Sequence, residues 1–568
     1  MINEVIIVFK THLDIGYTDY ASVVTEKYLN EFIPNALRIA EELRDTDTPF
    51  IWSCGSWLIY EGLKRDTDGR LEAAIRDGLI KWHALPFTSH TELMNEELFS
   101  YALSLSKKLD ERFGFKTVGA KMTDVPGHTK AMVPLLADAG VELLHIGVNP
   151  ATPVPNVPDV FKWRAFGKEI TVMYNKGYGN VIELGDKAFC FSITNDNLGP
   201  SGTDNVKALY DSLREKYPTA NVHAGTLDDV AIAVRGADLP VVEDEIGDSW
   251  IHGVATDPTK LRAYKAALRA ASGRLADFEL TDNLLLVPEH TWGMCVQVHL
   301  PNDEFYHVRD FDKIPGKEHI ERSWQEQREY VDKATELMGL DISEDMKVEL
   351  PDLSGAQRIS AEPSFEVIYQ LFDIEDMRRF EKDYLQITRL WAYSDMLKPG
   401  IPLDYKGGSY KAHTVAAYEK NGKKIFELEF NEDIKELCGL PTFFVIEDTN
   451  GVEIRWFGKK NNRLPEAIWA HPVGYGQDFI PIKMGKATNP KSSRHSRNLH
   501  AAEAVVNNDY RIDLIDSAVV APYGMHLWDF GTSEDSELYF NLYNNKWNTN
   551  FPLWFSDDAR FRFKITRI

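Results

Sequence analysis

The chain has 568 residues, of which 43% are hydrophobic and 26% are charged, as in an ordinary folded globular protein. Its 63 Lys and Arg are outnumbered by 87 Asp and Glu. The formal net charge of −24 repels phosphate backbones and anionic lipids, which argues against nucleic acid and membranes as partners.

Length, cysteine usage and hydrophobic runs set further expectations. A chain of this size is too long for one core, so we expect three or four domains. The sequence shows neither a secretory leader nor a run of about 18 apolar residues. The four cysteines are far apart, as in reduced core thiols (Cys54, Cys190, Cys295 and Cys438). We therefore predict a cytoplasmic protein without a membrane span; a homo-oligomer is compatible with these data.

The first 262 residues alternate strand-like and helical patterns. Runs rich in β-branched residues lie at 4–9, 49–54, 119–123 and 142–148, and helix-periodic segments lie at 23–45, 72–78, 100–114 and 132–140. This alternation predicts parallel strands covered by helices, and we expect an irregular α/β barrel over residues 1–262. Such folds bind their ligands at the carboxyl ends of the strands.

The pattern changes in the remainder of the chain. Long helix-periodic stretches at 258–286 and 319–340 predict a helical bundle over 263–390. Residues 391–568 are rich in aromatic and β-branched residues, with Asn-Gly turns at 421–422 and 450–451, and predict an antiparallel β-sandwich. The predicted architecture is therefore multidomain: α/β, then α, then β.

Polar residues follow the first predicted strand. His12 and Asp14 are two positions apart, so on extended backbone both side chains project to the same side. An imidazole and a carboxylate placed in this way are half of a zinc site. The alternative is a strand-end histidine that is hydrogen-bonded to a nearby aspartate. Tyr17 offers a flat face on which a sugar could pack.

Three later segments carry further candidates. Asp124 follows the strand-like run at 119–123, and His290 follows the apolar run 284–287. Taken alone, Asp124 fits a helix cap and His290 fits a structural histidine. The acidic stretch at 243–248 precedes Trp250 and His252. Like charges there would raise the pKa of one carboxyl, which suits a proton donor.

Together these segments resemble the class II α-mannosidase family, glycoside hydrolase family 38. The opening motif H-x-D-x-G-W is similar to residues 12–17, with Tyr17 in place of the tryptophan. The nucleophile motif D-x-F-G-H-S is similar to residues 124–129, and "LLLVPEH" at 284–290 is loosely similar to a third motif. The resemblance covers roughly residues 1–300.

The resemblance implies a retaining, zinc-dependent glycosidase that is similar to α-mannosidases and carries one zinc ion per chain. It implies His12, Asp14, Asp124 and His290 as metal ligands, with Asp124 also the nucleophile. The general acid is either Asp248 or Glu245, because the motif can be aligned in two registers; we prefer Asp248. Candidate substrate-binding residues are Tyr17, His90, Glu92, His128, Trp250, His252 and Trp292.

Two other functions stay open at this point. A metal-dependent carbohydrate deacetylase on a related barrel would use zinc-bound water to attack an ester or amide. A non-catalytic carbohydrate-binding protein would use some of the 13 tryptophans and 23 tyrosines for sugar stacking. Release of acetate from an acetylated sugar would indicate the deacetylase. Sugar binding without turnover would indicate the non-catalytic protein.

Overall fold

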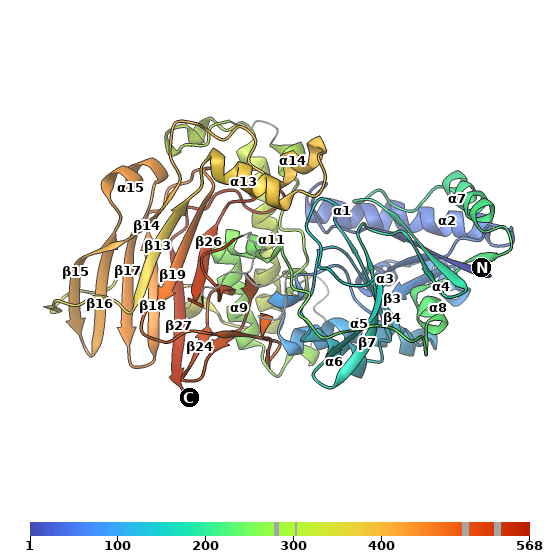
Figure 1. The fold of residues 1–568 in the computed structure, drawn as a ribbon, viewed down its shortest axis with the longest axis horizontal. Helices are drawn as coiled ribbons and strands as arrows, with labels where there is room; N and C mark the ends of the chain where they lie inside the picture. Colours follow the sequence, from blue (N-terminus) through green and yellow to red (C-terminus); the bar gives the residue numbers. More distant parts are fainter. Residues whose placement is uncertain (278–282, 301–303, 491–498, 528–535) are drawn as a thin grey trace. The chain divides into compact units, whose positions relative to one another are not determined.

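A computed structural model describes residues 1–277, 283–300, 304–490, 499–527 and 536–568 (Figure 1). The chain divides into two compact units, and neither unit is one continuous segment. Unit 1 comprises Met1–Thr91, Glu96–Asp244 and Pro288–Thr291. Unit 2 comprises Glu92–Asn95, Glu245–Val287 and Trp292–Ile568.

The first sheet of unit 1 is built around the buried strand β1 (Glu4–Thr11). Strand β9 (Lys187–Thr194) runs parallel to it on one side; β10 (Asn221–Ala224) and then β2 (Trp52–Gly55) run parallel on the other. Strands β3 (Ile80–His83) and β8 (Val181–Leu184) complete the sheet. Since Thr11 pairs with Thr194, β1 and β9 end at the same edge.

The second sheet of unit 1 has the order β11-β6-β7-β5-β4. Strands β4, β5 and β7 are parallel, whereas β6 and β7 form a hairpin. The bounds are β4 Gly119–Asp124, β5 Leu143–Val148, β6 Val160–Ala165, β7 Lys168–Asn175 and β11 Val241–Val242. The helices of unit 1 are α1 Ala21–Lys27, α2 Ile33–Leu43, α3 Ser56–Lys64, α4 Arg70–Arg76, α5 Glu96–Phe113, α6 Met132–Asp138, α7 Thr203–Lys216 and α8 Leu227–Ala233.

The predicted α/β character of this region is confirmed, and each strand and helix expected between residues 4 and 148 has a counterpart. The predicted irregular α/β barrel is not confirmed. The described strands of unit 1 fall into two hydrogen-bonded sheets, and each of these sheets has open edges.

Unit 2 contains two antiparallel sheets. The larger sheet has the order β12-β15-β16-β17-β18-β27-β24-β23-β20-β21, and the smaller has the order β14-β13-β19-β26-β25-β22. Their strands are β12 Gln357–Arg358, β13 Phe365–Leu371, β14 Gly408–Lys411, β15 His413–Lys420, β16 Lys423–Glu429, β17 Thr442–Asp448, β18 Gly451–Phe457, β19 Glu466–Pro472, β20 Ile480–Lys483, β21 Lys486–Ala487, β22 His500–Ala501, β23 Ala504–Val506, β24 Tyr510–Leu514, β25 Val519–Ala521, β26 Tyr539–Asn544 and β27 Ala559–Arg567.

One hydrophobic core joins the two sheets of unit 2. It includes Phe365 and Phe540 from the smaller sheet and Phe443, Trp456 and Phe563 from the larger one. Alternate residues of these strands face the core, which is the periodicity expected of half-buried strands. The prediction of an antiparallel β region in the C-terminal part is confirmed.

The described helices of unit 2 include a counterpart of the stretch predicted at 319–340, whereas the stretch predicted at 258–286 is shorter than expected. They are α9 Pro258–Ala270, α10 Val296–His299, α11 Lys317–Met338, α12 Ser343–Met346, α13 Ile374–Tyr384, α14 Leu390–Met396 and α15 Glu432–Cys438. The helix expected over 258–286 ends at Ala270, and Gly273 follows with a φ of +76°. Part of that stretch, 278–282, lies outside the described residues. Helices α9 and α11 pack together, but a bundle is not confirmed, and the predicted domain boundaries stay predictions.

Among the residues described, no helix combines the length and the apolar composition that crossing a bilayer requires.

Candidate metal centre and active site

His12 and Asp14 lie directly beyond β1, where the buried strand ends. Their side chains face each other as the two-residue spacing predicts, with His12 Nε2 3.1 Å from Asp14 Oδ1. Both are buried, at 1% and 3% exposure. Gly16 with a φ of +125° and Tyr17 with a φ of +60° turn the chain away from the strand. The turn leaves the two polar side chains at the sheet edge.

Asn197 fixes this turn from the segment that follows β9. Its Oδ1 accepts a hydrogen bond from the Asp14 backbone N–H at 3.1 Å. Its Nδ2 lies within hydrogen-bonding distance of the Asp14 and Gly16 carbonyls and of the Thr18 hydroxyl. Because β1 and β9 end side by side, a single buried amide can hold the whole loop.

Asp124 is the last residue of β4 and adopts a φ of +81°, a left-handed conformation that costs a non-glycine residue about 1–3 kcal/mol. Its Oδ1 accepts hydrogen bonds from the Tyr178 hydroxyl at 2.6 Å and from Asn149 Nδ2 at 3.1 Å. These two donors define the direction of the carboxylate. Strained backbone that is held by its surroundings is typical of functional sites.

His290 lies beside these residues on a short segment, Pro288–Thr291, which also belongs to unit 1. The segment pairs with residues 88–90 through two backbone hydrogen bonds. The backbone N–H of His90 donates to the Pro288 carbonyl, and the backbone N–H of His290 donates to the Thr88 carbonyl. His290 Nδ1 lies 2.6 Å from Glu289 Oε1. The other ring nitrogen, Nε2, lies 3.0 Å from Asp14 Oδ1 and 3.6 Å from Asp124 Oδ2.

The four side chains thus converge: His12, Asp14, Asp124 and His290 each offer one ligand atom, and these atoms all lie within 4.8 Å of one another. Nε2 of both histidines and Oδ2 of Asp14 are buried, and none of them has a hydrogen-bond partner among the residues that the structure describes. Unpaired buried polar atoms are costly, and a shared cation would satisfy all of them. Two imidazoles and two carboxylates are ligand types that zinc accepts. The residues therefore fit a metal ion.

The electrostatics of the cluster also favour a cation. Burial raises the pKa of Asp14, but the imidazoles of His12 and His290 outweigh burial and hold it well below its usual range. Burial lowers the pKa of His290, yet Glu289 and Asp14 raise it well above the ordinary histidine value. Asp14 therefore stays ionised and attracts positive charge to this point, which a metal ion can supply in place of a proton.

Asp196 adds a third carboxyl group to the neighbourhood. The Tyr178 hydroxyl lies 2.7 Å from Asp196 Oδ1 as well as 2.6 Å from Asp124 Oδ1. A hydroxyl donates only one proton, so it can bond both groups when Asp196 carries a proton of its own. Burial, together with the nearby Asp14 charge, raises the pKa of Asp196 to about 6. In mildly acidic solution Asp196 therefore retains its proton. The residue is also partly exposed.

Both candidate general acids lie in unit 2, within a buried cluster. Lys483 Nζ lies 2.8 Å from both Glu245 Oε1 and Glu92 Oε2. The Asp248 backbone N–H donates to Glu92 Oε1 at 3.1 Å, and Asp248 Oδ1 accepts from the Trp250 N–H. Burial raises the pKa of Glu92 to about 7. Glu245 is therefore bound in an ion pair with Lys483, whereas Asp248 accepts from a backbone N–H.

The remaining predicted substrate-binding residues differ in accessibility. Tyr17 is half-buried, whereas His90 and His128 are fully buried, and His128 Nδ1 lies 3.3 Å from the Thr91 hydroxyl. In unit 2, Trp250 and His252 pack against Trp547 with ring centroids 5.3 and 4.5 Å apart.

Trp292 is likewise buried, beneath Lys260 Nζ, which lies 3.7 Å from its ring centroid. These contacts are those of packed core residues. The substrate roles stay predictions.

Four neighbours of the centre were not singled out in the sequence: Asn149, Tyr178, Asp196 and Asn197. Asp196 and Asn197 follow β9 directly, in "TNDNLGP", and a polar strand end of that kind is the same signal that marked His12 and Asp14. Asn149 follows β5 in the same way. Tyr178 has no local signal, because its role depends on two carboxylates from distant segments.

Comparison with known proteins relates this chain to others by its fold. Residues 254–362 match a family described as "Domain of unknown function (DUF5054)". No curated protein matches the sequence. Among solved structures, an α-mannosidase from Enterococcus faecalis V583 aligns with a TM-score of 0.58 at 10% identity, covering 100% of this chain and 87% of that one. A protein in glycosyl hydrolase family 38 from Enterococcus faecalis aligns with a TM-score of 0.52 at 10% identity, covering 100% and 86%.

The whole chain therefore resembles glycoside hydrolase family 38 in fold, as the sequence motifs predicted. At 10% identity the likeness concerns the fold.

Proposed function

We propose that this protein is a metal-dependent glycoside hydrolase that acts on α-mannosides, with one zinc ion held by His12, Asp14, Asp124 and His290. The observation that carries the proposal is the convergence of four buried ligand atoms within 4.8 Å. The fold it shares with an α-mannosidase supports the substrate class. The ion, when bound, would supply Lewis-acid stabilisation and a fixed point for sugar hydroxyls.

Asp124 is the proposed nucleophile. Its side chain is 11% exposed, against 1–4% for the other three ligands, so it is the member that substrate reaches most readily. Tyr178 and Asn149 hold its carboxylate in one orientation. In a double displacement Asp124 attacks the anomeric carbon as the leaving oxygen takes a proton, and water then releases the sugar with retained configuration.

A second carboxyl must give up that proton and later accept one from water. Asp196 and Asp248 are the proposed candidates, and Glu245 is less suitable because of its ion pair with Lys483. We favour Asp196. Its raised pKa of about 6 and its link to Asp124 through one hydroxyl suit a proton donor.

Metal analysis and a panel of nitrophenyl α- and β-glycosides test the proposal. We expect about one zinc per chain and retained anomeric configuration. Asp124→Asn should lower kcat by at least about a thousandfold. Asp110→Asn is the matched control, because Asp110 is a buried aspartate of unit 1 whose carboxylate binds Thr117.

Other outcomes point elsewhere. Full turnover by a zinc-loaded Asp124→Asn protein would rule out the mechanism. Acetate release from acetylated sugars without glycoside turnover would indicate a deacetylase. Tight sugar binding without either reaction would indicate a non-catalytic protein.

The choice of leaving group shows which carboxyl is the general acid. Dinitrophenolate leaves the sugar without being protonated, whereas the alkoxide of an alkyl glycoside must be protonated as it leaves. We expect Asp196→Asn to lose about 10²–10⁴-fold in rate on the alkyl substrate and little of the first step on the dinitrophenyl one. If Asp248→Asn shows this selectivity instead, the role belongs to Asp248.

A further inference from the structure

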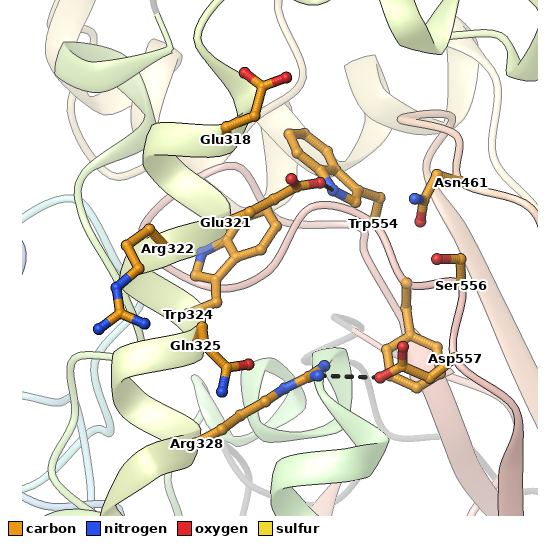
Figure 2. A pocket seen from close by; sticks show the side chains of 11 residues that line it. Glu318, Glu321, Arg322, Trp324, Gln325, Arg328, Asn461, Trp554, Ser556 and Asp557 are labelled. Atoms are coloured by element: carbon orange, nitrogen blue, oxygen red, sulfur yellow. Dashed lines mark hydrogen bonds and ion pairs between the residues drawn. The ribbon is translucent and has the colours of Figure 1, made fainter.

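Lys121 is a buried lysine of unit 1 that the proposed mechanism does not use. It lies on β4, three residues before Asp124, and is 1% exposed. A lysine is seldom fully buried unless it is paired with an acidic group. Figure 2 shows such a pair for another cation, with Arg328 of unit 2 joined to Asp557 at 3.0 Å. By contrast, no described carboxylate lies within ion-pairing distance of Lys121 Nζ, whose partners are of another kind.

The first partner of Lys121 is His145 on the neighbouring strand β5. The two residues are opposite each other in the parallel pair β4–β5, and Lys121 Nζ lies 2.7 Å from His145 Nδ1. His145 Nε2 lies 2.7 Å from Asn175 Oδ1. An amide oxygen only accepts hydrogen bonds, so Nε2 carries the ring proton and Nδ1 accepts from Lys121. Burial and the nearby Lys121 lower the pKa of His145 well below its ordinary value, which keeps the ring neutral as this pattern requires.

The second partner of Lys121 is the backbone carbonyl of Tyr178, which lies 3.2 Å from Nζ. Asn175 is the last residue of β7, so the Lys121–His145 pair binds both ends of the turn that leaves this strand, residues 175–178. Burial lowers the pKa of Lys121 well below its ordinary value. The two contacts persist in either protonation state, because they need two N–H groups and a neutral amine has two.

Gly147 allows the same turn to approach β5 closely. A Cβ atom at position 147 would lie 2.1 Å from the carbonyl oxygen of Tyr178 and 3.0 Å from that of Gly177. The backbone of the turn therefore passes directly against the strand, two residues beyond His145. Hydrogen bonds and a close steric contact together fix the backbone at Tyr178.

The hydroxyl group of Tyr178 lies between the proposed nucleophile and the proposed acid. It is 2.6 Å from Asp124 Oδ1 and 2.7 Å from Asp196 Oδ1. A tyrosine side chain has few rotamers, so the place of its hydroxyl depends on the place of its backbone. We propose that Lys121 and His145 are positioning residues, which hold Tyr178 so that its hydroxyl contacts both carboxyl groups. The consequence for catalysis rests on the proposed function; the positioning of Tyr178 does not.

A double-mutant cycle tests whether Lys121 acts through Tyr178. Lys121→Met keeps the length of the side chain and removes its N–H donors. On alkyl mannosides at saturating zinc we expect it to lower kcat about three- to thirtyfold at nearly constant KM. Tyr178→Phe should lower kcat about ten- to a hundredfold, the effect of one hydrogen bond to a charged group. The double variant should be no slower than Tyr178→Phe, because Lys121 acts only through that residue.

Carbon NMR of the full chain, with carbon-13 at Cζ of its tyrosines, tests the positioning without any turnover. Tyr178→Phe assigns the Tyr178 resonance, whose chemical shift depends on the hydrogen bonds of the hydroxyl. We expect Lys121→Met to displace this resonance. His145→Leu removes the other member of the pair and should displace it too, which provides a second variant in case Lys121→Met does not fold.

Lys162→Met is the matched control. Lys162 lies on β6 of the same sheet, and its Nζ donates to the Thr171 hydroxyl at 2.7 Å. The control should leave both kcat and the Tyr178 resonance unchanged. The proposal is overturned if the resonance stays in place in a folded Lys121→Met or His145→Leu protein, or if the losses in kcat multiply in the double variant. Absence of glycoside turnover in the unaltered protein would refute the proposed function, and the resonance alone would then decide whether Lys121 positions Tyr178.

Discussion

Replacing Glu289 by glutamine tests whether the His290 imidazole is oriented for a metal ion. Glu289 Oε1 lies 2.6 Å from His290 Nδ1, while Oε2 accepts from the Thr291 N–H at 2.9 Å and from the Thr291 hydroxyl. Glutamine keeps the shape but has one oxygen. If that oxygen faces His290, an amide N–H₂ group opposes the Thr291 donors, and the negative charge behind the imidazole is lost.

The expected cost follows from these contacts. Changing a group that orients a metal-bound histidine weakens metal binding about 10–100-fold, which corresponds to about 1.4–2.7 kcal/mol. We expect the upper half of that range, because both a charge and a hydrogen bond are lost. Competition against a chromophoric chelator measures the zinc affinity. Turnover at saturating zinc should stay close to that of the unaltered protein.

Glu61→Gln provides the control, since Glu61 is also buried in unit 1 and paired, with Lys64, away from the cluster. A Glu289→Gln protein that binds zinc within twofold of the original would refute the reasoning. It would mean that His290 is held by its backbone alone, or that it does not bind the metal.

Three further outcomes follow from the centre. Asp124→Gly should be about 1 kcal/mol more stable to urea than Asp124→Ala, because glycine adopts a φ of +81° without strain, and an equal stability would contradict this. Burial raises the pKa of Asp196 to about 6, so its proton is present below that pH and lost above it. Rates on alkyl glycosides should therefore fall as pH rises through about 6, and Asp196→Asn should abolish this dependence. Asn197→Ala removes the hydrogen bonds that hold the loop of residues 14–18. It should lower the free energy of unfolding in urea by about 2–3 kcal/mol and weaken zinc binding. An unchanged urea unfolding curve would contradict the proposed role of Asn197 in holding the loop.

The resemblance to glycoside hydrolase family 38 predicted the set of four clustered residues, and local sequence pattern supported three of them. His12, Asp14 and Asp124 follow buried strands, where parallel sheets expose their polar ends. Family resemblance added His290, whose segment has no strand periodicity of its own. Asn197 and Tyr178 escaped notice because their partners lie 183 and 54 residues away, a distance over which local pattern carries no information.

For the fold, the sequence predicted most of the strands and helices but not how the strands pair. Strand and helix periodicities gave the elements, since they depend on local burial. They did not show that the strands of unit 1 divide into two sheets, because pairing depends on which edges meet. The helix expected to continue to residue 286 stops at Ala270. The prediction was too long because the alanine- and leucine-rich composition continues the helical pattern through Gly273. The backbone of Gly273, with a φ of +76°, is not helical.

The path of the chain through unit 1 restricts how the protein can be shortened or built. Three of the four ligand residues lie before residue 125, but the fourth arrives only after the chain has left unit 1 and returned as Pro288–Thr291. An N-terminal fragment ending near residue 244 would retain both sheets of this unit but only three of the four clustered residues. During synthesis the cluster likewise stays incomplete until residue 290 has emerged from the ribosome, so the proposed metal ion would meet all four residues only late in translation or in the finished chain.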